Sequence, residues 1–303
     1  MIGTKPTPAS IAQVPDSRGP GAEFVLTFRC TDSLGIVQAV SEFLLRHECY
    51  IVDIKQFGDR SEGHFYMRVH FTSTAGTATS EQLREDFTPL ADEWRMDWRL
   101  ERHGRKQRIL VMVSKYEHCL NDLLVRTRSG ELPVEIAAVV SNHGDLEGLA
   151  AWHGIPFHHI PVTPETKPEA EARLLELVDA YDVELVVLAR YMQVLSDSLT
   201  VRLAGKAINI HHSFLPSFKG AKPYHQAYER GVKTVGATAH YVNSELDEGP
   251  IIAQQVIEVD HTYTPSDLVT VGKDAECKAL TNAVRWHAEG RIILSGNRTV
   301  ILR

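Results

Sequence analysis

The fold is best understood outward from one stretch, Ile208-Asn209-Ile210-His211-His212-Ser213-Phe214-Leu215-Pro216-Ser217-Phe218-Lys219-Gly220. Its apolar start predicts the end of a buried strand, after which a proline and a glycine turn the chain. Polar groups at the carboxyl end of a strand in an α/β sheet lie where such sheets place their ligand crevice. Because alternate residues of a strand share a face, we expect Asn209 and His211 to converge on one reacting atom, whereas His212 points away.

Asn209 and His211 suit chemistry at an acyl or formyl carbonyl. The amide of Asn209 can donate a hydrogen bond to the oxyanion of a tetrahedral intermediate. An imidazole such as His211 can stabilise the same charge and move protons near neutral pH. A carboxylate must then orient the imidazole, and the candidate is Asp247 in the loop Ser244-Glu245-Leu246-Asp247-Glu248-Gly249-Pro250. Taken alone, an Asn-x-His at a strand end also suits a purely structural role.

A metal site is another use of such histidines. His211, His212 and His240 could ligate a cation, but the chain has no His-x-x-x-His helix motif and no paired cysteines to complete the site. We therefore expect neither a metal nor a redox cofactor.

Strands and helices alternate around this stretch. The strands are expected at 108–113, 134–141, 157–160, 185–189, 207–211, 234–242 and 251–259, and the helices at 117–128, 146–153, 169–181 and from Pro265 through Trp286. Such repetition predicts a doubly wound, mostly parallel, Rossmann-like α/β sheet.

The first third of the chain follows a different pattern. Strands are expected at 24–28, 50–58, 64–71 and 95–102, with one helix after the turn at Thr31–Gly35 and another opening at Ser80, whose hydroxyl can cap it. The order βαββαβ predicts a four-stranded antiparallel, ferredoxin-like sheet backed by two helices. We divide the chain into a flexible tail at 1–21, this domain at 22–103 and the larger domain at 104–303.

Composition narrows the class of protein. Of the 303 residues 43% are hydrophobic and 23% are charged, as in a soluble globular protein, and the net charge of −7 comes without a block of Lys or Arg. Neither nucleic acid nor a membrane surface is therefore an expected partner. No apolar run approaches the roughly 20 residues that a bilayer requires. The four cysteines show no paired spacing and indicate reduced thiols in a cytoplasmic protein: Cys30, Cys49, Cys119 and Cys277.

Three segments together resemble the signature of the folate-dependent formyltransferases, and more closely the formyltetrahydrofolate deformylase family: Asn209-Ile210-His211, Leu215-Pro216-Ser217-Phe218 and Asp247-Glu248-Gly249-Pro250. The resemblance extends over nearly the whole chain from about Glu23. It implies that 10-formyltetrahydrofolate and water are the substrates, with Asn209, His211 and Asp247 as the catalytic residues. It also implies a folate-binding set made of Tyr191, Met192, Gln193, Val194, Leu195, His240 and Gly249, although an apolar run such as 191–195 is also typical of plain core.

The smaller domain resembles an ACT domain, with Thr31-Asp32-Ser33-Leu34-Gly35-Ile36-Val37 similar to its ligand loop. Such domains bind small amino acids between paired copies. The resemblance implies a homo-oligomer, a dimer or tetramer, with glycine or methionine as a possible effector at Asp32, Leu34, Gly35 and Ile36. Dimerisation without any ligand is the equal alternative.

The expected reaction is hydrolysis of 10-formyltetrahydrofolate to formate and tetrahydrofolate, which balances the one-carbon pool and supplies formate for purine biosynthesis. The alternatives are a transferase that passes the formyl group to an amine such as glycinamide ribonucleotide, and an amino-acid sensor that only binds folate. The loop 113–120 favours the hydrolase, because it has no glycine to receive a phosphate and Glu117 carries a like charge, although Lys115 and His118 could attract one.

Overall fold

The computed structural model describes residues 21–73, 78–216 and 223–303. Contacts divide the chain between His103 and Gly104 into two compact units, which are described separately below. The expected tail at 1–21 lies outside the described residues except for Gly21, as does the 217–220 part of the stretch quoted first. In the described part of the chain, no helix combines the length and the apolar character that crossing a bilayer takes.

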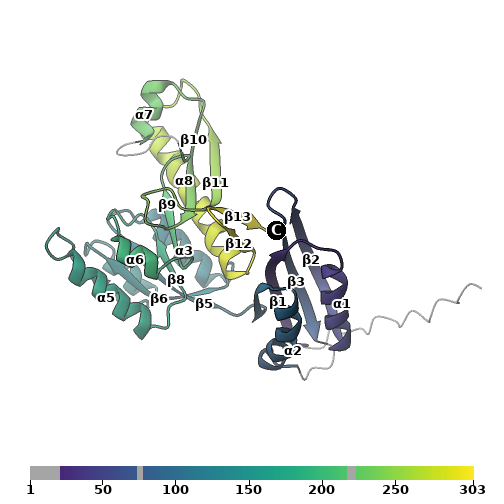
Figure 1. The fold of residues 1–303 in the computed structure, drawn as a ribbon. Helices are drawn as coiled ribbons and strands as arrows, with labels where there is room; N and C mark the ends of the chain where they lie inside the picture. Colours follow the sequence, from purple (N-terminus) through teal and green to yellow (C-terminus); the bar gives the residue numbers. More distant parts are fainter. Residues whose placement is uncertain (1–20, 74–77, 217–222) are drawn as a thin grey trace, which may run out of the picture. The chain divides into compact units, whose positions relative to one another are not determined.

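The first unit is an antiparallel sheet with two helices (Figure 1). Its elements are β1 (Glu23–Thr31), α1 (Ile36–Arg46), β2 (Cys49–Asp59), β3 (His64–Ser73), α2 (Ser80–Glu93) and β4 (Asp97–Arg102). The strand order β2-β3-β1-β4 confirms the predicted βαββαβ arrangement. Alternate residues of β1, Phe24, Leu26 and Phe28, pack with the helices in one buried core, as a sheet covered on one face requires.

Two local predictions for this unit were wrong. The cap of α2 is Thr79, whose side chain accepts a hydrogen bond from the backbone N–H of Gln82 at 3.2 Å, so Ser80 is the first helical residue and not the cap. The fourth strand begins at Asp97 and not at Arg95. Arg95 has a φ of 51°, and this left-handed residue reverses the chain after the helix before the strand can start.

The second unit is built on a seven-stranded sheet with the order β11-β10-β9-β8-β5-β6-β7. The strands are β5 (Gln107–Val113), β6 (Val134–Ser141), β7 (Phe157–His159), β8 (Leu185–Leu188), β9 (Ala207–His211), β10 (Thr234–Tyr241) and β11 (Ile251–Glu258). The helices are α3 (His118–Arg128), α4 (Glu147–Trp152), α5 (Lys167–Ala180), α6 (Asp197–Arg202), α7 (Pro223–Arg230) and α8 (Pro265–Ala288), and a hairpin of β12 (Ile292–Ser295) and β13 (Arg298–Ile301) follows. The neighbouring strands β7, β6, β5, β8 and β9 all run parallel to one another. Strand β10 runs antiparallel to both of its neighbours, β9 and β11. This arrangement confirms the mostly parallel, doubly wound sheet (Figure 1).

The two faces of this sheet carry different cores. Ile208 and Ile210 of β9 pack with α3, α4 and α8, whereas Ala207 packs with α5 and α6. By alternation Asn209 and His211 share the face of Ala207. The helices α6 and α7 and the terminal hairpin had no counterpart in the sequence prediction, because six to eight residues carry too little periodicity to stand out.

Candidate active site

The candidate active site lies where β9 and β10 meet. His240 of β10 is paired in register with Asn209 of β9, so the sheet itself brings the two side chains together. The pairing of β10 with β11 shifts between Ala239 and His240, and irregularities of this kind re-aim side chains next to functional sites. Asp247 lies in the loop after β10. The two ends of this loop are joined by a hydrogen bond of 2.9 Å from the backbone N–H of Tyr241 to the carbonyl oxygen of Pro250.

The structure brings all three predicted catalytic residues into contact. Nδ1 of His211 lies 3.2 Å from Oδ2 of Asp247, and Nδ2 of Asn209 lies 3.5 Å from Oδ1 of the same carboxylate. The histidine expected near them, His240, has its Nε2 at 3.2 Å from Nδ2 of Asn209 and 3.6 Å from Oδ1 of Asp247. Four side chains thus form one connected polar cluster.

The orientation of His240 is set by the backbone. Its Nδ1–H donates to the carbonyl of Tyr241 at 2.9 Å, so its Nε2 faces Asn209. Gly249, predicted to bind substrate, lies behind this arrangement. A Cβ at Gly249 would stand 1.7 Å from the oxygen of Tyr241 and 3.3 Å from Nδ1 of His240, so only glycine fits at this close approach.

Asp247 is the electrostatic centre of the cluster. Burial alone would raise the pKa of its carboxyl, but hydrogen bonds from His211 and His240, together with their charges, hold that pKa well below its usual range. Its backbone has a φ of 58°, a left-handed conformation that is uncommon outside glycine and that clusters at functional sites. The carboxylate is therefore ionised at neutral pH and firmly placed.

His211 presents a free nitrogen to the site. The side chain is 7% exposed, and its Nδ1 is held by Asp247. Nε2 is buried and, within the residues that the structure describes, has no hydrogen-bond partner. A buried unsatisfied nitrogen costs free energy, roughly 1–3 kcal/mol, and such groups in native proteins often await a ligand or a water.

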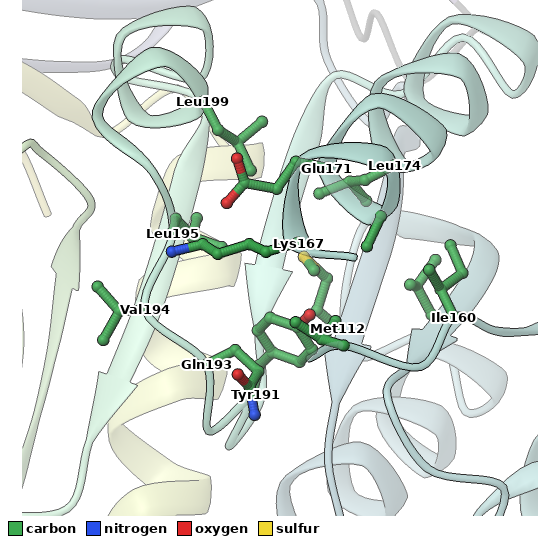
Figure 2. A pocket seen from close by; sticks show the side chains of 13 residues that line it. Met112, Ile160, Lys167, Glu171, Leu174, Tyr191, Gln193, Val194, Leu195 and Leu199 are labelled. Carbon is green, nitrogen blue, oxygen red and sulfur yellow. The ribbon is translucent and has the colours of Figure 1, made fainter. Parts of the chain in front are cut away.

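A pocket opens beside the trio, on the face of the sheet that carries Asn209. Strand β8 ends at Leu188, which is paired in register with Asn209 of β9. The loop that follows β8 therefore begins at the edge of the site. This hollow of about 350 Å³ opens to solvent and is lined mainly by apolar side chains (Figure 2). It includes four of the five predicted loop residues: Tyr191, Gln193, Val194 and Leu195.

Met192, the fifth, is not part of the pocket lining, and its side chain is 52% exposed. Its backbone N–H donates to Oγ of Ser114 at 2.9 Å, and Ser114 in turn donates to Oδ1 of Asn142 at 2.7 Å. This chain of bonds ties the loop after β8 to the ends of β5 and β6. Burial raises the pKa of Tyr191 to about 12, so its phenol remains a neutral hydrogen-bond donor.

Sequence reasoning missed several residues of the pocket. Lys167 and Glu171 of α5 bring two opposite charges to a mainly apolar lining, and Figure 2 shows Lys167 stretched toward the loop of Val194 and Leu195. Glu171 also accepts the backbone N–H of Ser196 at 2.8 Å. Glu171 falls on the helix predicted at 169–181 and Lys167 lies two residues before its start, and nothing else in the sequence marks either residue.

The effector residues expected in the first unit form the turn before α1. Gly35 has a φ of 101° and precedes the helix, Leu34 is 99% exposed, and Ile36 is buried in the core. A Cβ at Gly58 would lie 3.4 Å from Oδ2 of Asp32, which places this turn against β2.

Comparison with known proteins agrees with the architecture. Residues 107–284 match the formyl transferase family, which is more than half of the chain. The formyltetrahydrofolate deformylase of Corynebacterium sp. (strain P-1) is 63% identical over 279 residues, 92% of this chain and 98% of the relative. The crystal structure of a formyltetrahydrofolate deformylase from Burkholderia mallei is 50% identical, with a TM-score of 0.89 over 93% of this chain and 100% of the other.

A second group of solved structures covers only part of the chain. Glycinamide ribonucleotide transformylase 1 from Symbiobacterium toebii is 35% identical, with a TM-score of 0.62 over 68% of this chain and 98% of that one. The deformylases are matched over both units of the chain, and the transformylase over little more than the length of the second. By sequence and by fold, this chain belongs to the formyl transferase family and, within it, to the formyltetrahydrofolate deformylases.

Proposed function

We propose that this protein hydrolyses 10-formyltetrahydrofolate to formate and tetrahydrofolate. The observation that carries the proposal is the buried Nε2 of His211, which has no hydrogen-bond partner among the described residues and whose ring is held through Nδ1 by the ionised Asp247. Such a nitrogen is positioned to meet the oxygen of a formyl group.

His211 and Asn209 stabilise the oxyanion in this proposal. His211, whose Nδ1 is held by Asp247, donates a hydrogen bond from Nε2 to the formyl oxygen as charge develops there. The two hydrogens of Asn209 Nδ2 face His240 and Asp247 before substrate binds. The contact to Asp247 is long, at 3.5 Å, and it is the one that the oxyanion replaces.

Asp247 also receives the attacking water. A carboxylate has about four acceptor positions, and within the described part of the chain the contacts of Oδ1 are long, at 3.5 and 3.6 Å. The water oxygen bonds to the formyl carbon, the bond from that carbon to N10 breaks, and a proton passes to N10. Formate and tetrahydrofolate leave, and no metal or redox cofactor takes part.

The pocket beside the trio receives the folate. Tyr191, Gln193, Val194 and Leu195 offer the mainly apolar walls and few polar groups that suit a flat ring system. Met192 contributes through the hydrogen bond that fixes its backbone. His240 positions Asn209, and Gly249 allows the close packing that orients His240.

Transfer of the formyl group to an amine is the second candidate, because solved transformylases share the fold of the second unit. A folate-binding sensor is less favoured, since binding alone does not require Asn209, His211 and Asp247 in mutual contact. Purified protein given 10-formyltetrahydrofolate without any amine tests all three functions. Catalytic release of formate supports the hydrolase, whereas no release without an amine supports the transferase, and binding without turnover supports the sensor.

The first unit serves assembly in this proposal and, as a further step, regulation by glycine or methionine at the turn of Asp32, Leu34, Gly35 and Ile36. The edge strand β2 supports a homo-oligomer, dimer or tetramer, because Tyr50, Val52, Ile54 and Phe57 expose apolar side chains along it. Four free cysteines support a cytoplasmic location. There the reaction would balance the one-carbon pool and supply formate for purine biosynthesis.

A further inference from the structure

Three side chains of the first unit, two imidazoles and a carboxylate, meet at one oxygen atom. Oε2 of Glu23 lies 2.8 Å from Nε2 of His70 and 3.1 Å from Nδ1 of His103. The two imidazole rings stack, with their centroids 4.1 Å apart and their planes at 26°. The three atoms that can ligate a metal all lie within 4.8 Å of one another. They are therefore close enough together to share one cation.

The antiparallel sheet holds these three side chains on one face. Phe24 packs in the core with the helices, so its neighbour Glu23 lies on the opposite face of β1. His70 of β3 is paired in register with Val25, two residues along β1 from Glu23, and so shares that face. His103 directly follows β4, and its backbone N–H donates to the carbonyl oxygen of Glu23 at 2.8 Å. Sites built on strands hold their geometry better than sites on loops.

The cluster differs from an ordinary surface ion pair in the same unit. His47 has one imidazole nitrogen 3.1 Å from the carboxylate of Asp86, whereas Oε2 of Glu23 is shared by two imidazoles. The side chains of Glu23 and His103 are each 45% exposed, and that of His70 is 14% exposed. A cation from solvent can therefore reach the cluster, while one of its ligands is held in a mostly buried position.

The distances suit a transition-metal ion of the zinc class. Zn²⁺ bonds nitrogen and carboxylate oxygen at about 2.0–2.1 Å, which places neighbouring ligand atoms of a tetrahedron about 3.3 Å apart. The contacts of Glu23, at 2.8 and 3.1 Å, need to open by no more than about 0.5 Å to reach this spacing. Each neutral imidazole then carries its proton on the other ring nitrogen and gives a lone pair to the metal. Two nitrogen ligands favour Zn²⁺, Ni²⁺ or Cu²⁺ over Mg²⁺ and Ca²⁺, which prefer oxygen ligands.

We propose that Glu23, His70 and His103 form a binding site for a divalent transition metal of the zinc class. The metal joins β1, β3 and the residue after β4, and water completes its coordination. Because the three ligands are far apart in the unfolded chain, metal binding stabilises the folded first unit. The site lies wholly within this unit, and its metal is not a cofactor of the hydrolysis proposed above. The inference therefore does not depend on that function.

A second group of possible metal ligands, in the other unit, is less suited to a cation. Across the described residues, the one other group with ligand atoms this close is His118, Cys119 and Glu276. Its carboxylate already accepts a hydrogen bond from Nε2 of His118 at 2.7 Å, and Nε of Arg190 lies 3.4 Å from it. Glu276 and Arg190 are both buried, so the guanidinium already supplies the positive charge there. The thiol of Cys119 also gives this group a spectroscopic signature that the first cluster lacks.

The test is metal binding by the full-length protein after treatment with a chelator and dialysis. Zn²⁺ is titrated by calorimetry in competition with a chelator of known affinity, and the melting temperature is measured with and without Zn²⁺. The variants Glu23→Gln and His103→Gln each remove one ligand at a half-exposed position, where folding is least at risk. His47→Gln is the matched control, because it removes an imidazole that faces a single carboxylate in the same unit. Co²⁺ is the spectroscopic probe, since a thiolate ligand adds a charge-transfer band that nitrogen and oxygen ligands do not.

We expect the wild-type protein and His47→Gln to bind one Zn²⁺ tightly and to melt at a higher temperature with it. Glu23→Gln and His103→Gln should each bind about tenfold more weakly or worse, because the loss of an outer partner alone can cost that much. Both should lose the gain in melting temperature, and the Co²⁺ complex of the wild-type protein should show no thiolate band. Wild-type affinity in both ligand variants would show adventitious binding elsewhere and overturn the inference. A wild-type protein that binds no Zn²⁺ would overturn it too, as would a thiolate band, which would place the metal at Cys119.

Discussion

Replacing Asp247 by asparagine is the sharpest test of the trio, because it removes a charge and little else. Asparagine has the same shape and adopts the left-handed backbone as readily as aspartate, so the φ of 58° at this position adds no new strain. Alanine does not tolerate a left-handed backbone as well, so Asp247→Ala would combine the loss of the charge with backbone strain. The change therefore isolates the contribution of the negative charge to the reaction.

The expected magnitude follows from the distances. Oδ2 of Asp247 lies 3.2 Å from Nδ1 of His211. Unit charges about 4 Å apart attract by roughly 4 kcal/mol at an effective dielectric constant of about 20. Because the amide dipole of asparagine retains part of this interaction, we expect a loss of about 3 kcal/mol of transition-state stabilisation, or roughly 10²-fold in kcat.

The assay is formate release, followed by coupling to formate dehydrogenase. Asp260→Asn serves as the control, because Asp260 is an exposed carboxylate that bonds to Thr262 within its own turn. It should leave kcat unchanged. A kcat of Asp247→Asn within about threefold of the wild-type value, less than 1 kcal/mol, would show that the charge of Asp247 has no part in the mechanism.

The same variant carries a stability prediction with a definite sign. The pKa of Asp247 is lower in the folded protein than in the unfolded chain, where it is about 3.9. The ionised carboxylate therefore stabilises the fold at pH values above the unfolded pKa, and this stabilisation is lost as the pH falls toward the folded pKa. The difference in unfolding free energy between wild type and Asp247→Asn, measured in urea, should stay constant above about pH 5 and shrink below about pH 4. A difference that widens in acid would contradict the assignment.

Further expectations concern the trio, two glycines and the acceptor. Asn209→Ala and His211→Ala should each lower kcat by about 10² or more, and the double variant should lose far less than the product of the two, because the residues act as one unit; full additivity would argue for independent roles. Gly249→Ala, whose Cβ would stand 1.7 Å from the oxygen of Tyr241, should lower the melting temperature and kcat together, and wild-type values of both would refute the packing argument. Titration calorimetry with glycine or methionine should show saturable heat that Gly35→Val abolishes, since valine at a φ of 101° distorts the turn; heat retained in this variant would place the ligand elsewhere. Glycinamide ribonucleotide should accept no formyl group and leave formate release unchanged, whereas formylation at the rate of formate release would make the protein a transferase.

Local sequence patterns were sufficient to predict the strand that carries the site. β9 was predicted with its observed bounds, Ala207–His211, because an apolar run ending in polar residues and a turn is a signal within the strand itself. The partnership of Asp247 with His211 also followed from chemistry, since an imidazole that carries charge needs a carboxylate. His240 could be placed near them, but its register opposite Asn209 came only from the pairing of β9 with β10.

Contacts between distant segments could not be predicted. Glu276 and His118 lie 158 positions apart in the sequence, and nothing in either helix marks one as the partner of the other. The bond from Met192 to Ser114 is hidden for the same reason, because it depends on the neighbouring positions of β5 and β8 in the sheet. Neighbouring residues can mislead as well: Thr79 and Ser80 are both good caps, and only the helix start distinguishes them.

Two adjacent imidazoles with opposite surroundings explain how one strand end serves two purposes. Alternation turns His211 toward Asp247 and His212 toward Arg190, so one ring meets a negative charge and the next a positive one. Burial and then the charge of Arg190 lower the pKa of His212 to about 4, so this second ring is neutral at physiological pH. The two residues are of the same type, and they differ because distant segments of the chain place Asp247 beside His211 and Arg190 near His212. Because His212 is neutral, it adds no positive charge beside His211, whose ring centroid lies 5.1 Å away.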